Sequence, residues 1–202
     1  MLLGVARDIG EQIVYTRLDT GRTGPTNRRA LEVLEKARVV HRIRTADPSG
    51  PPLAASARCR RFKAALLDIG LLQRLSGVPP DVELRSEDLL AMYRGKLAEQ
   101  FVAQELVASC SPSLHYWTRD ARGSSAEVDF LVVRRGRVTP VEVKSGAGGS
   151  LRSLRLFLDS RPDCREGIVL RSGPFSRHTA DRLTFLPLYA AASIADPLPD
   201  SP

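Results

Sequence analysis

Two short segments place acidic and basic side chains where a hydrolytic site would need them. Glu127–Leu131 sets Asp129 at the start of an apolar run, and Pro140–Ser145 sets Glu142 and Lys144 two residues apart. Alternate side chains of a strand share a face, so Glu142 and Lys144 would point one way and the neighbouring valines the other way, into a core. Two carboxylates and an ammonium that meet at one end of a sheet are the groups of a Mg²⁺-dependent phosphodiesterase.

The residues between these segments predict a β-hairpin. Apolar runs at Val128–Val133 and Val138–Val143 flank a polar turn of three arginines and a glycine, a pattern typical of two paired strands. Folding this hairpin would bring Asp129 beside Glu142. The carboxylates would then hold a hard cation, Mg²⁺ or Mn²⁺, and Lys144 would orient water and offset charge on a phosphate.

A helix before the hairpin offers one more acid. The segment Gly95–Leu106 carries apolar residues at helical spacing. Glu99 lies at the border of this apolar stripe, so its carboxylate would point toward the sheet edge and join Asp129 and Glu142. Glu105, on the same helix, is the alternative acid, and the spacing leaves both open.

Several of these residues also allow simpler interpretations. An acid and a lysine on an edge strand, such as Glu142 and Lys144, often form a solvated ion pair worth about 0.2–1 kcal/mol. Tyr116 and Trp117, just before the hairpin, could stack on bases in a nucleic-acid channel or pack in the core. The loop Gly146–Gly149 could let the backbone approach a phosphate.

Composition indicates an ordinary globular protein with a basic excess. The 202 residues are 43% hydrophobic and 26% charged with a net charge of +7, which suits one medium domain or two small ones. The excess fits a nucleic-acid partner but also follows from arginine-rich composition alone. Three scattered cysteines without a CxxC pair disfavour a zinc site and a disulfide scaffold. No run approaches the ~18 apolar residues of a membrane helix, and an acid comes too early for a signal peptide, so we expect a cytoplasmic protein without a membrane partner.

Residues 1–58 predict a winged helix-turn-helix module. Helices are expected over residues 4–18 and 26–37, a strand over 39–43 and a wing over 45–57. The N-terminal end of the second helix in such modules meets phosphates and base edges, which makes Asn27, Arg28 and Arg29 the candidate nucleic-acid contacts. Because Glu32 and Glu35 lie on the same helix, a protein–protein module remains the alternative.

Residues 59–195 predict an α/β domain, and residues 196–202 a disordered tail. A short strand leads into a helix capped by Asp68, followed by the Glu99 helix, the hairpin, a helix over 150–160 and strands over 167–170 and 183–188. This order predicts a restriction-endonuclease-like core, a mixed sheet flanked by helices.

The acids and the lysine, in this order, resemble the PD-(D/E)xK nuclease superfamily. Asp129 corresponds to the D and Glu142-Val-Lys144 to the ExK, whereas Val128 stands where the name has proline. The resemblance implies that Glu99, Asp129 and Glu142 bind Mg²⁺ and that Lys144 assists the cleavage of DNA.

The chain also resembles the C-terminal half of a group of bacterial and archaeal ATP-binding proteins. There, an AAA-type ATPase domain precedes a winged helix and an endonuclease-like domain of unknown function. The matching pieces are Arg28–Ile43, Phe62–Leu72, Gly95–Leu106, Tyr116–Trp117 with Glu127–Leu131, and Val141–Ser145. No GxxxxGK[ST] motif is present, so we expect no ATP hydrolysis. The resemblance implies an AAA-type ATPase domain as a partner, in cis or in trans.

Two hypotheses about function follow from these observations. The first is a Mg²⁺-dependent DNA nuclease, and the second is a non-catalytic DNA-binding or regulatory module with a degenerate nuclease fold. The sequence does not choose between them, because the residue set is complete in either case and only its geometry differs.

Overall fold

A single mixed sheet runs through the computed structural model, which describes residues 1–77, 91–111, 113–121, 124–146, 149–178 and 180–194. Within these ranges eight strands pair in the order β2-β1-β3-β4-β5-β6-β8-β7. The bounds are Val40–Thr45 (β1), Arg58–Leu66 (β2), His115–Ala121 (β3), Ser124–Arg134 (β4), Arg137–Lys144 (β5), Gly167–Arg171 (β6), Ser176–His178 (β7) and Leu183–Pro187 (β8). The predicted α/β class, a mixed sheet with flanking helices, is confirmed.

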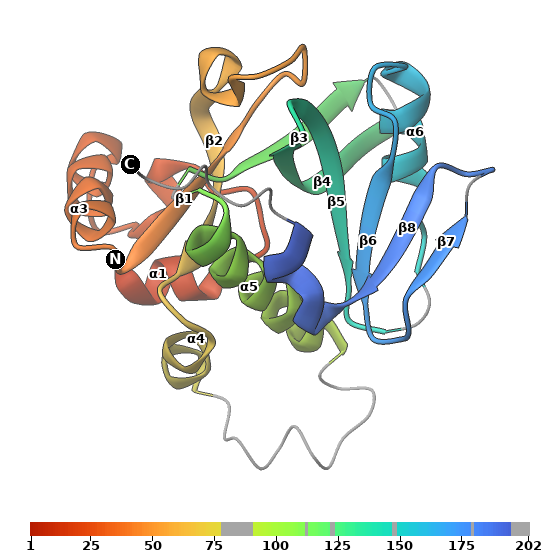
Figure 1. Cartoon of the computed structure of the whole chain (residues 1–202). Helices are drawn as coiled ribbons and strands as arrows, with labels where there is room; N and C mark the ends of the chain where they lie inside the picture. Colours follow the sequence, from red (N-terminus) through yellow and green to blue (C-terminus); the bar gives the residue numbers. More distant parts are fainter. Residues whose placement is uncertain (78–90, 112, 122–123, 147–148, 179, 195–202) are drawn as a thin grey trace, which may run out of the picture.

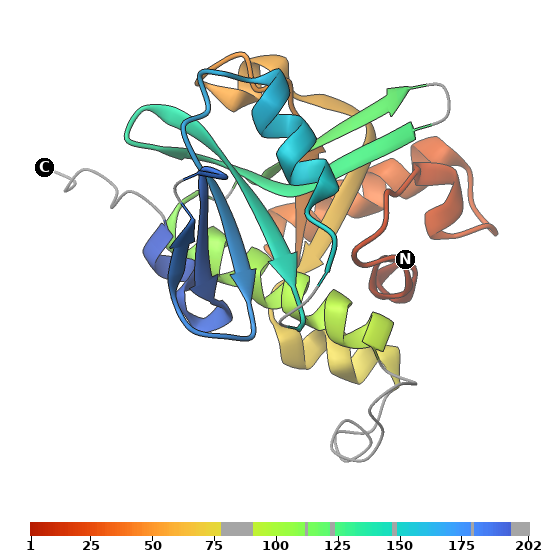
Figure 2. The same cartoon turned by 90° about the vertical axis from the view of Figure 1, so that its right-hand side faces the viewer.

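Helices cover both faces of this sheet. The long α5 and the 3₁₀ helix η3 lie on one face, and α6 crosses the other (Figures 1 and 2). The bounds are Leu2–Arg7 (α1), Tyr15–Leu18 (α2), Gly24–Lys36 (α3), Leu53–Ser56 (η1), Ile69–Ser76 (α4), Ala91–Ser109 (α5), Arg152–Ser160 (α6) and Leu188–Ile194 (η3). In the described part of the chain, none of the helices combines the length and apolar character needed to cross a bilayer.

The first predicted helix is wrong, because the chain breaks it into α1 and α2. Gly10 has a φ of +80°, which a helix does not accommodate. Ile13 then exchanges two backbone hydrogen bonds with Phe62 of β2. The N-terminal segment therefore lies along the edge strand of the sheet and does not form one continuous helix. The cap predicted at Asp68 is confirmed, since its carboxylate accepts a hydrogen bond from the Leu71 amide at the start of α4.

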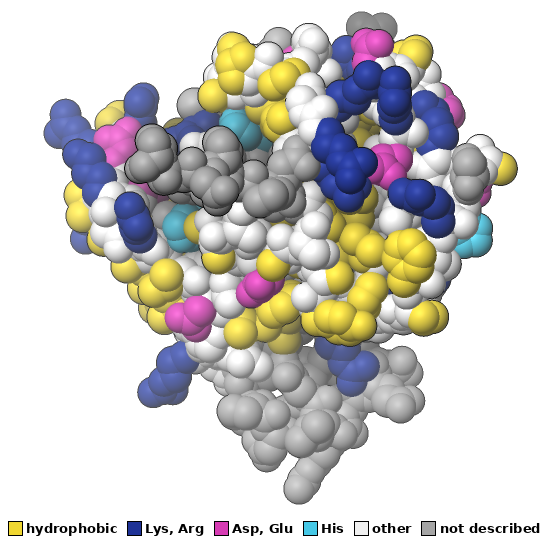
Figure 3. All heavy atoms as spheres, viewed as in Figure 1, with side chains coloured by type: hydrophobic (Ala, Val, Ile, Leu, Met, Phe, Trp, Pro, Cys, Tyr) yellow, Lys and Arg dark blue, Asp and Glu magenta, His cyan; other side chains and the backbone are white. Residues whose placement is uncertain are grey.

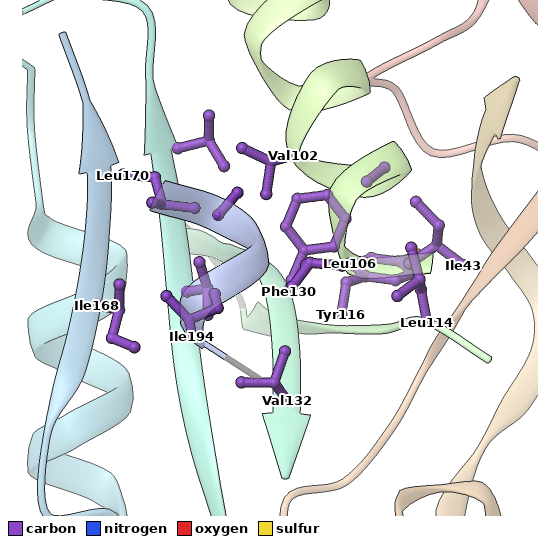
Figure 4. Close-up of a cluster of buried hydrophobic side chains, with 14 of the residues drawn as sticks. Ile43, Val102, Leu106, Leu114, Tyr116, Phe130, Val132, Ile168, Leu170 and Ile194 are labelled. Carbon is purple, nitrogen blue, oxygen red and sulfur yellow. The ribbon is translucent and has the colours of Figure 1, made fainter. Parts of the chain in front are cut away.

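The core between α5 and the sheet is continuous. Figure 4 shows Val102 and Leu106 of α5 facing Tyr116, Phe130 and neighbouring strand residues. These side chains are almost fully buried. Burial of such apolar area is the main stabilising term, at about 25 cal/mol per Å², and it holds α5 at a fixed position over β3, β4 and β5.

The predicted hairpin is confirmed as β4 and β5. The two strands pair antiparallel from Arg134–Arg137 to Phe130–Val141. The turn residues Arg135 and Gly136 both have positive φ, 50° and 72°, as the tight two-residue turns of β-hairpins require. β5 lies between β4 and β6 in the sheet, so the expected alternative of an edge strand is wrong for Glu142 and Lys144.

The strands β4 and β5 separate beyond the Phe130–Val141 pair. From Ser124 to Val128, β4 pairs only with β3, and the two strands form a ribbon that extends away from the rest of the sheet (Figure 2). The β3–β4 register shifts between the Trp117–Val128 and His115–Leu131 pairs, which marks a β-bulge. A bulge bends its strand and re-aims side chains, and this one falls at Asp129.

The predicted boundary between residues 58 and 59 falls at the start of β2, which begins at Arg58. β1 pairs antiparallel with β2 and parallel with β3, so the N-terminal elements share one sheet with the C-terminal ones. The division into residues 1–58 and 59–195 stays a prediction. The tail predicted over 196–202 lies outside the described residues.

Candidate functional site

Asp129 lies at the point where β4 and β5 separate. Its Oδ2 accepts a hydrogen bond from the Val143 amide at 2.8 Å, so a side chain replaces the strand backbone as partner of this amide. Asp129 and Glu142 occupy neighbouring positions, one residue beyond the last β4–β5 pair. The hairpin thus brings the two predicted acids together.

Glu142 and Lys144 form a close ion pair on β5. The Lys144 ammonium donates to Glu142 Oε1 at 2.7 Å, and the Glu142 side chain is only 9% exposed. The other oxygen, Oε2, is buried and has no hydrogen-bond partner among the described residues. Gly149, at a φ of +133°, leaves room for this lysine, because a Cβ there would lie 2.9 Å from Lys144 Cδ.

A buried lysine that the sequence analysis missed links the remaining acids. Lys63 of β2 is 1% exposed, and its ammonium contacts the Glu99 carboxylate. The same Nζ lies 3.0 Å from Glu127 Oε1 and 3.5 Å from Asp129 Oδ1. We call Lys63, Glu99, Glu127, Asp129, Glu142 and Lys144 the acid–lysine site.

The helix acid of the site is Glu99, not Glu105. Glu99 reaches Lys63 from α5, so α5 contributes to the site as predicted. Among the described residues Glu105 forms no ion pair with the site, and its backbone carbonyl accepts the Ser109 hydroxyl. Glu105 lies six residues after Glu99, about 1.7 helical turns, so the two side chains leave the helix in different directions.

The N-terminal segment forms one wall of the site. Gln12 donates from Nε2 to Glu127 Oε2 at 2.8 Å and to Thr118 Oγ1 at 3.3 Å. A Cβ added at Gly10 would lie 3.4 Å from Glu99 Oε2. The segment that pairs with β2 at Ile13 therefore binds Glu127 through Gln12 and passes close to Glu99 at Gly10.

The charges of the site do not balance when every group is ionised. Four carboxylates share two ammonium groups, which leaves two negative charges in excess. Burial raises the pKa of Glu99 to about 8, opposed by Lys63 and reinforced by Asp129 and Glu127. Burial and the Asp129 charge raise the pKa of Glu142 to about 7, against the pull of Lys144. Burial alone would lower the pKa of Lys63, but the carboxylates around it raise that pKa well above its usual value.

The donor chemistry of the site suits a hard cation. Carboxylate oxygens are the ligands that Mg²⁺ prefers. Glu142, whose Oε2 has no partner among the described residues, and Asp129 occupy neighbouring strand positions. Among the described side chains, however, no three of the His, Cys, Asp and Glu type already stand in a metal-binding arrangement. Glu99, Glu127 and Asp129 converge on the Lys63 ammonium instead.

The predicted nucleic-acid contacts lie apart from this site, on α3. Arg28 is exposed and pairs with Glu32 at 2.9 Å, and Arg29 is also exposed. Asn27 is fully buried, and its amide donates to the backbone carbonyls of Tyr15 and Asp19. Asn27 therefore fixes α2 and the following turn against α3, and its amide faces the interior.

The aromatic pair before the hairpin packs in the core. Tyr116 and Trp117 are 0% and 8% exposed. Trp117 meets Phe157 of α6 edge to face at 5.1 Å between ring centroids, and Tyr116 lies 5.9 Å from the Lys63 ammonium. The packing interpretation therefore describes both rings, and neither forms an exposed stacking platform.

Replacing Lys63 should strongly destabilise the fold. The Lys63→Met variant would leave buried carboxylates without their cation, which costs about 3–5 kcal/mol in comparable buried pairs. Urea unfolding measures this loss. Lys96→Met is the matched control, because Lys96 lies 3.9 Å from the exposed Glu11 and should cost less than about 1 kcal/mol. Equal stability of the two variants would show that Lys63 does not hold the site together.

The free energy of unfolding should fall as pH rises from about 4.5 to about 8. The folded-state pKa values of Glu99 and Glu142, about 8 and about 7, lie above the ordinary 4.5. In this window the unfolded chain releases protons that the folded chain keeps. The stabilisation that the two protonated carboxyls provide is therefore complete below their pKa in the unfolded chain. It is lost as the pH rises to their pKa values in the folded chain, by at most ~1.4 kcal/mol per pH unit for each carboxyl.

Urea unfolding over this pH range tests the slope. Glu99→Gln and Glu142→Gln should each flatten it, because an amide does not titrate. A slope unchanged in both variants would assign the pH dependence to other groups.

Comparison with known proteins places part of the site in a described family region. Residues 94–191 match the family model of a domain of unknown function, DUF4143. The matched region includes Glu99, Glu127, Asp129, Glu142 and Lys144, whereas Lys63 precedes it. Neither the curated proteins nor the solved structures gave a match. Over just under half of its length, this chain is thus similar to a domain whose description gives no function.

Proposed function

We propose that this chain is a Mg²⁺-dependent DNA phosphodiesterase of the PD-(D/E)xK type. The observation that carries the proposal is the meeting of Asp129, Glu142 and Lys144 where β4 and β5 separate, with one buried Glu142 oxygen lacking a partner. In this proposal α5, the β4–β5 hairpin, α6 and β6 form a restriction-endonuclease-like core, with a winged-helix module before it. DNA is the substrate, and the cytoplasm is the location.

Each side chain has a role that its position supports. Asp129 and Glu142 would hold the cation, with Glu99 as the third acid, and a bound Mg²⁺ would supply Lewis-acid stabilisation of phosphate charge. Lys144, whose ammonium already donates to Glu142, would orient the attacking water and offset charge on the phosphate. Lys63 would keep Glu99, Glu127 and Asp129 gathered without meeting substrate, because it is almost fully buried.

The charge imbalance supports a divalent ion in particular. The site carries two negative charges beyond what Lys63 and Lys144 neutralise. Burial is the main cause of the raised pKa values of Glu99 and Glu142, and the charge of neighbouring carboxylates adds to it. A divalent cation supplies two positive charges and would displace the protons from these two carboxyls.

The second candidate is a non-catalytic DNA-binding or regulatory module. The observation that favours it is Lys63, whose ammonium is where three carboxylates converge. In that case the acids stabilise the fold by pairing with Lys63 and bind no metal. An AAA-type ATPase domain, in cis or in trans, is then the partner that the module regulates.

Binding of Mn²⁺ separates the two candidates. Titration calorimetry should show binding by the wild-type chain that Asp129→Ala removes, because that variant loses a central oxygen ligand. Asp163→Ala is the control, since Asp163 is exposed and outside the site. In the presence of Mn²⁺, the wild type and Asp163→Ala should cleave single-stranded, duplex or branched DNA, and Asp129→Ala should not. Identical Mn²⁺ binding by the wild type and Asp129→Ala would contradict the proposal.

Lys144 tests the catalytic role directly. Lys144→Ala should lower the cleavage rate by about 10²–10⁴-fold, the usual contribution of a water-positioning or acid–base group, while Mn²⁺ binding persists. Lys144→Arg should also fail, because a planar guanidinium does not replace a compact ammonium. Full cleavage by Lys144→Arg would show that Lys144 contributes only its positive charge, and would favour the second candidate.

A further inference from the structure

A large groove opens beside the acid–lysine site, on the α6 face of the sheet. It has a volume of about 930 Å³ and lies between the β3–β4 ribbon and the start of α6. Figure 2 shows α6 in front of the sheet and the ribbon extending to the upper right. We call it the arginine groove. Its principal polar lining residues are Arg119, Ser125, Ser150, Arg152, Arg155 and Asp159.

The groove has an excess of positive charge. Its lining includes three arginines and one aspartate. Arg119 and Arg152 are exposed, and within the described part of the chain neither has an acidic partner. Arg155 contacts Asp181 at 3.2 Å between two exposed side chains, a pairing that water and salt weaken. Asp159 lies 3.5 Å from Arg182, which offsets its charge.

The start of α6 adds to the preference for an anion. The helix begins at Arg152, its N-cap residue Leu151 provides no side-chain cap, and its first turn holds no acidic residue; the Arg152 amide donates a long hydrogen bond of 3.3 Å to Ser150 Oγ. Arg152 is unfavourable there by itself, because the N-terminal end of a helix already carries partial positive charge. A negatively charged ligand in the groove would be attracted by both the arginines and the helix end.

The groove continues into the acid–lysine site. Gly149 lines the groove and packs against the Lys144 side chain. On the other wall, Ser125 and Ala126 directly precede Glu127 on β4, and Arg119 pairs with Ala126 across the ribbon. A chain of phosphates bound in the groove would therefore lead directly to Lys144.

We infer that the arginine groove binds the phosphodiester backbone of a nucleic-acid strand. The inference rests on the proposed function for the destination of the strand, but the binding itself requires no metal and no cleavage. Among the described residues that line the groove none is aromatic, so the contacts proposed here are to phosphates rather than to stacked bases. Binding is consequently independent of sequence and steeply dependent on salt.

Fluorescence anisotropy with labelled single-stranded and duplex oligonucleotides in EDTA tests the groove separately from catalysis. Arg119→Glu combined with Arg152→Glu should weaken binding by at least about tenfold. Loss of two phosphate contacts should also reduce the slope of log affinity against log salt by roughly 1.4 for a single strand or 1.8 for a duplex. The matched control is Arg137→Glu combined with Arg165→Glu. Both arginines are exposed and lie at the start of β5 and just before β6, at the end of these strands away from Lys144.

The control carries the same change in net charge, so it should bind nearly as well as the wild type. Figure 3, viewed as in Figure 1, shows basic side chains gathered at the upper right of the surface. The control double variant is needed because such surface charge also attracts DNA. Equal weakening in both double variants, or no weakening in the groove variant, would overturn the inference. If the groove variant fails to bind but the wild type never cleaves DNA, the groove stands and the proposed catalysis falls.

Discussion

Charge balance at one buried position governs this structure. Four carboxylates gather where two strands of the sheet separate, and in the described part of the chain two ammonium groups neutralise them. Ionised groups are costly to remove from water unless they are paired. Lys63, almost without solvent contact, is therefore indispensable to the arrangement, and the elements around it are arranged so that their acids reach it: β2 supplies the lysine, α5 supplies Glu99, and β4 supplies Glu127 and Asp129.

The separation of β4 and β5 explains how acids come to lie in the middle of a sheet. A continuous ladder would pair the Val143 amide with backbone, but here the Asp129 carboxylate accepts that hydrogen bond. The bulge in β4 turns Asp129 toward Lys63, while Glu142 and Lys144 remain on β5. The site thus connects the two faces of the sheet. Lys63 and Glu99 belong to the face covered by α5, whereas Lys144 packs against Gly149, which lines the arginine groove.

Much of this site could be predicted from local patterns. The hairpin followed from two apolar runs around a polar turn, because that signal lies within about a dozen residues. Helical spacing narrowed the helix acid to Glu99 or Glu105, and the contact with Lys63 then selects Glu99. Lys63 could not be found in this way. It is separated from Glu99 by 36 residues of sequence and from Asp129 by 66, and in a strand pattern it appears as an ordinary surface lysine. Its single signal is its alternation with Phe62 and Ala64, which implies a side chain facing opposite to theirs.

The N-terminal region shows where local patterns mislead. A helix over residues 4–18 fits the composition, but pairing of Ile13 with Phe62 and the positive φ of Gly10 divide it into two short helices. Asn27, which a helix-turn-helix interpretation directs toward DNA, instead satisfies two backbone carbonyls in the interior. Ile13 and Phe62 are too far apart in the sequence for a local pattern to relate them. Asn27 and its partners lie only 8 and 12 residues apart, but hydrophobic periodicity does not report a side-chain bond to a backbone carbonyl.

Two excess negative charges should make the acid–lysine site receptive to a divalent cation. The most direct measurement is the thermal unfolding midpoint with and without Mg²⁺, at constant ionic strength, near pH 5.5 and near pH 8. A ligand that binds the folded state raises the midpoint. The account predicts a clear rise near pH 8, where protons no longer compensate Glu99 and Glu142, and a much smaller one near pH 5.5. An unchanged midpoint near pH 8 would contradict it.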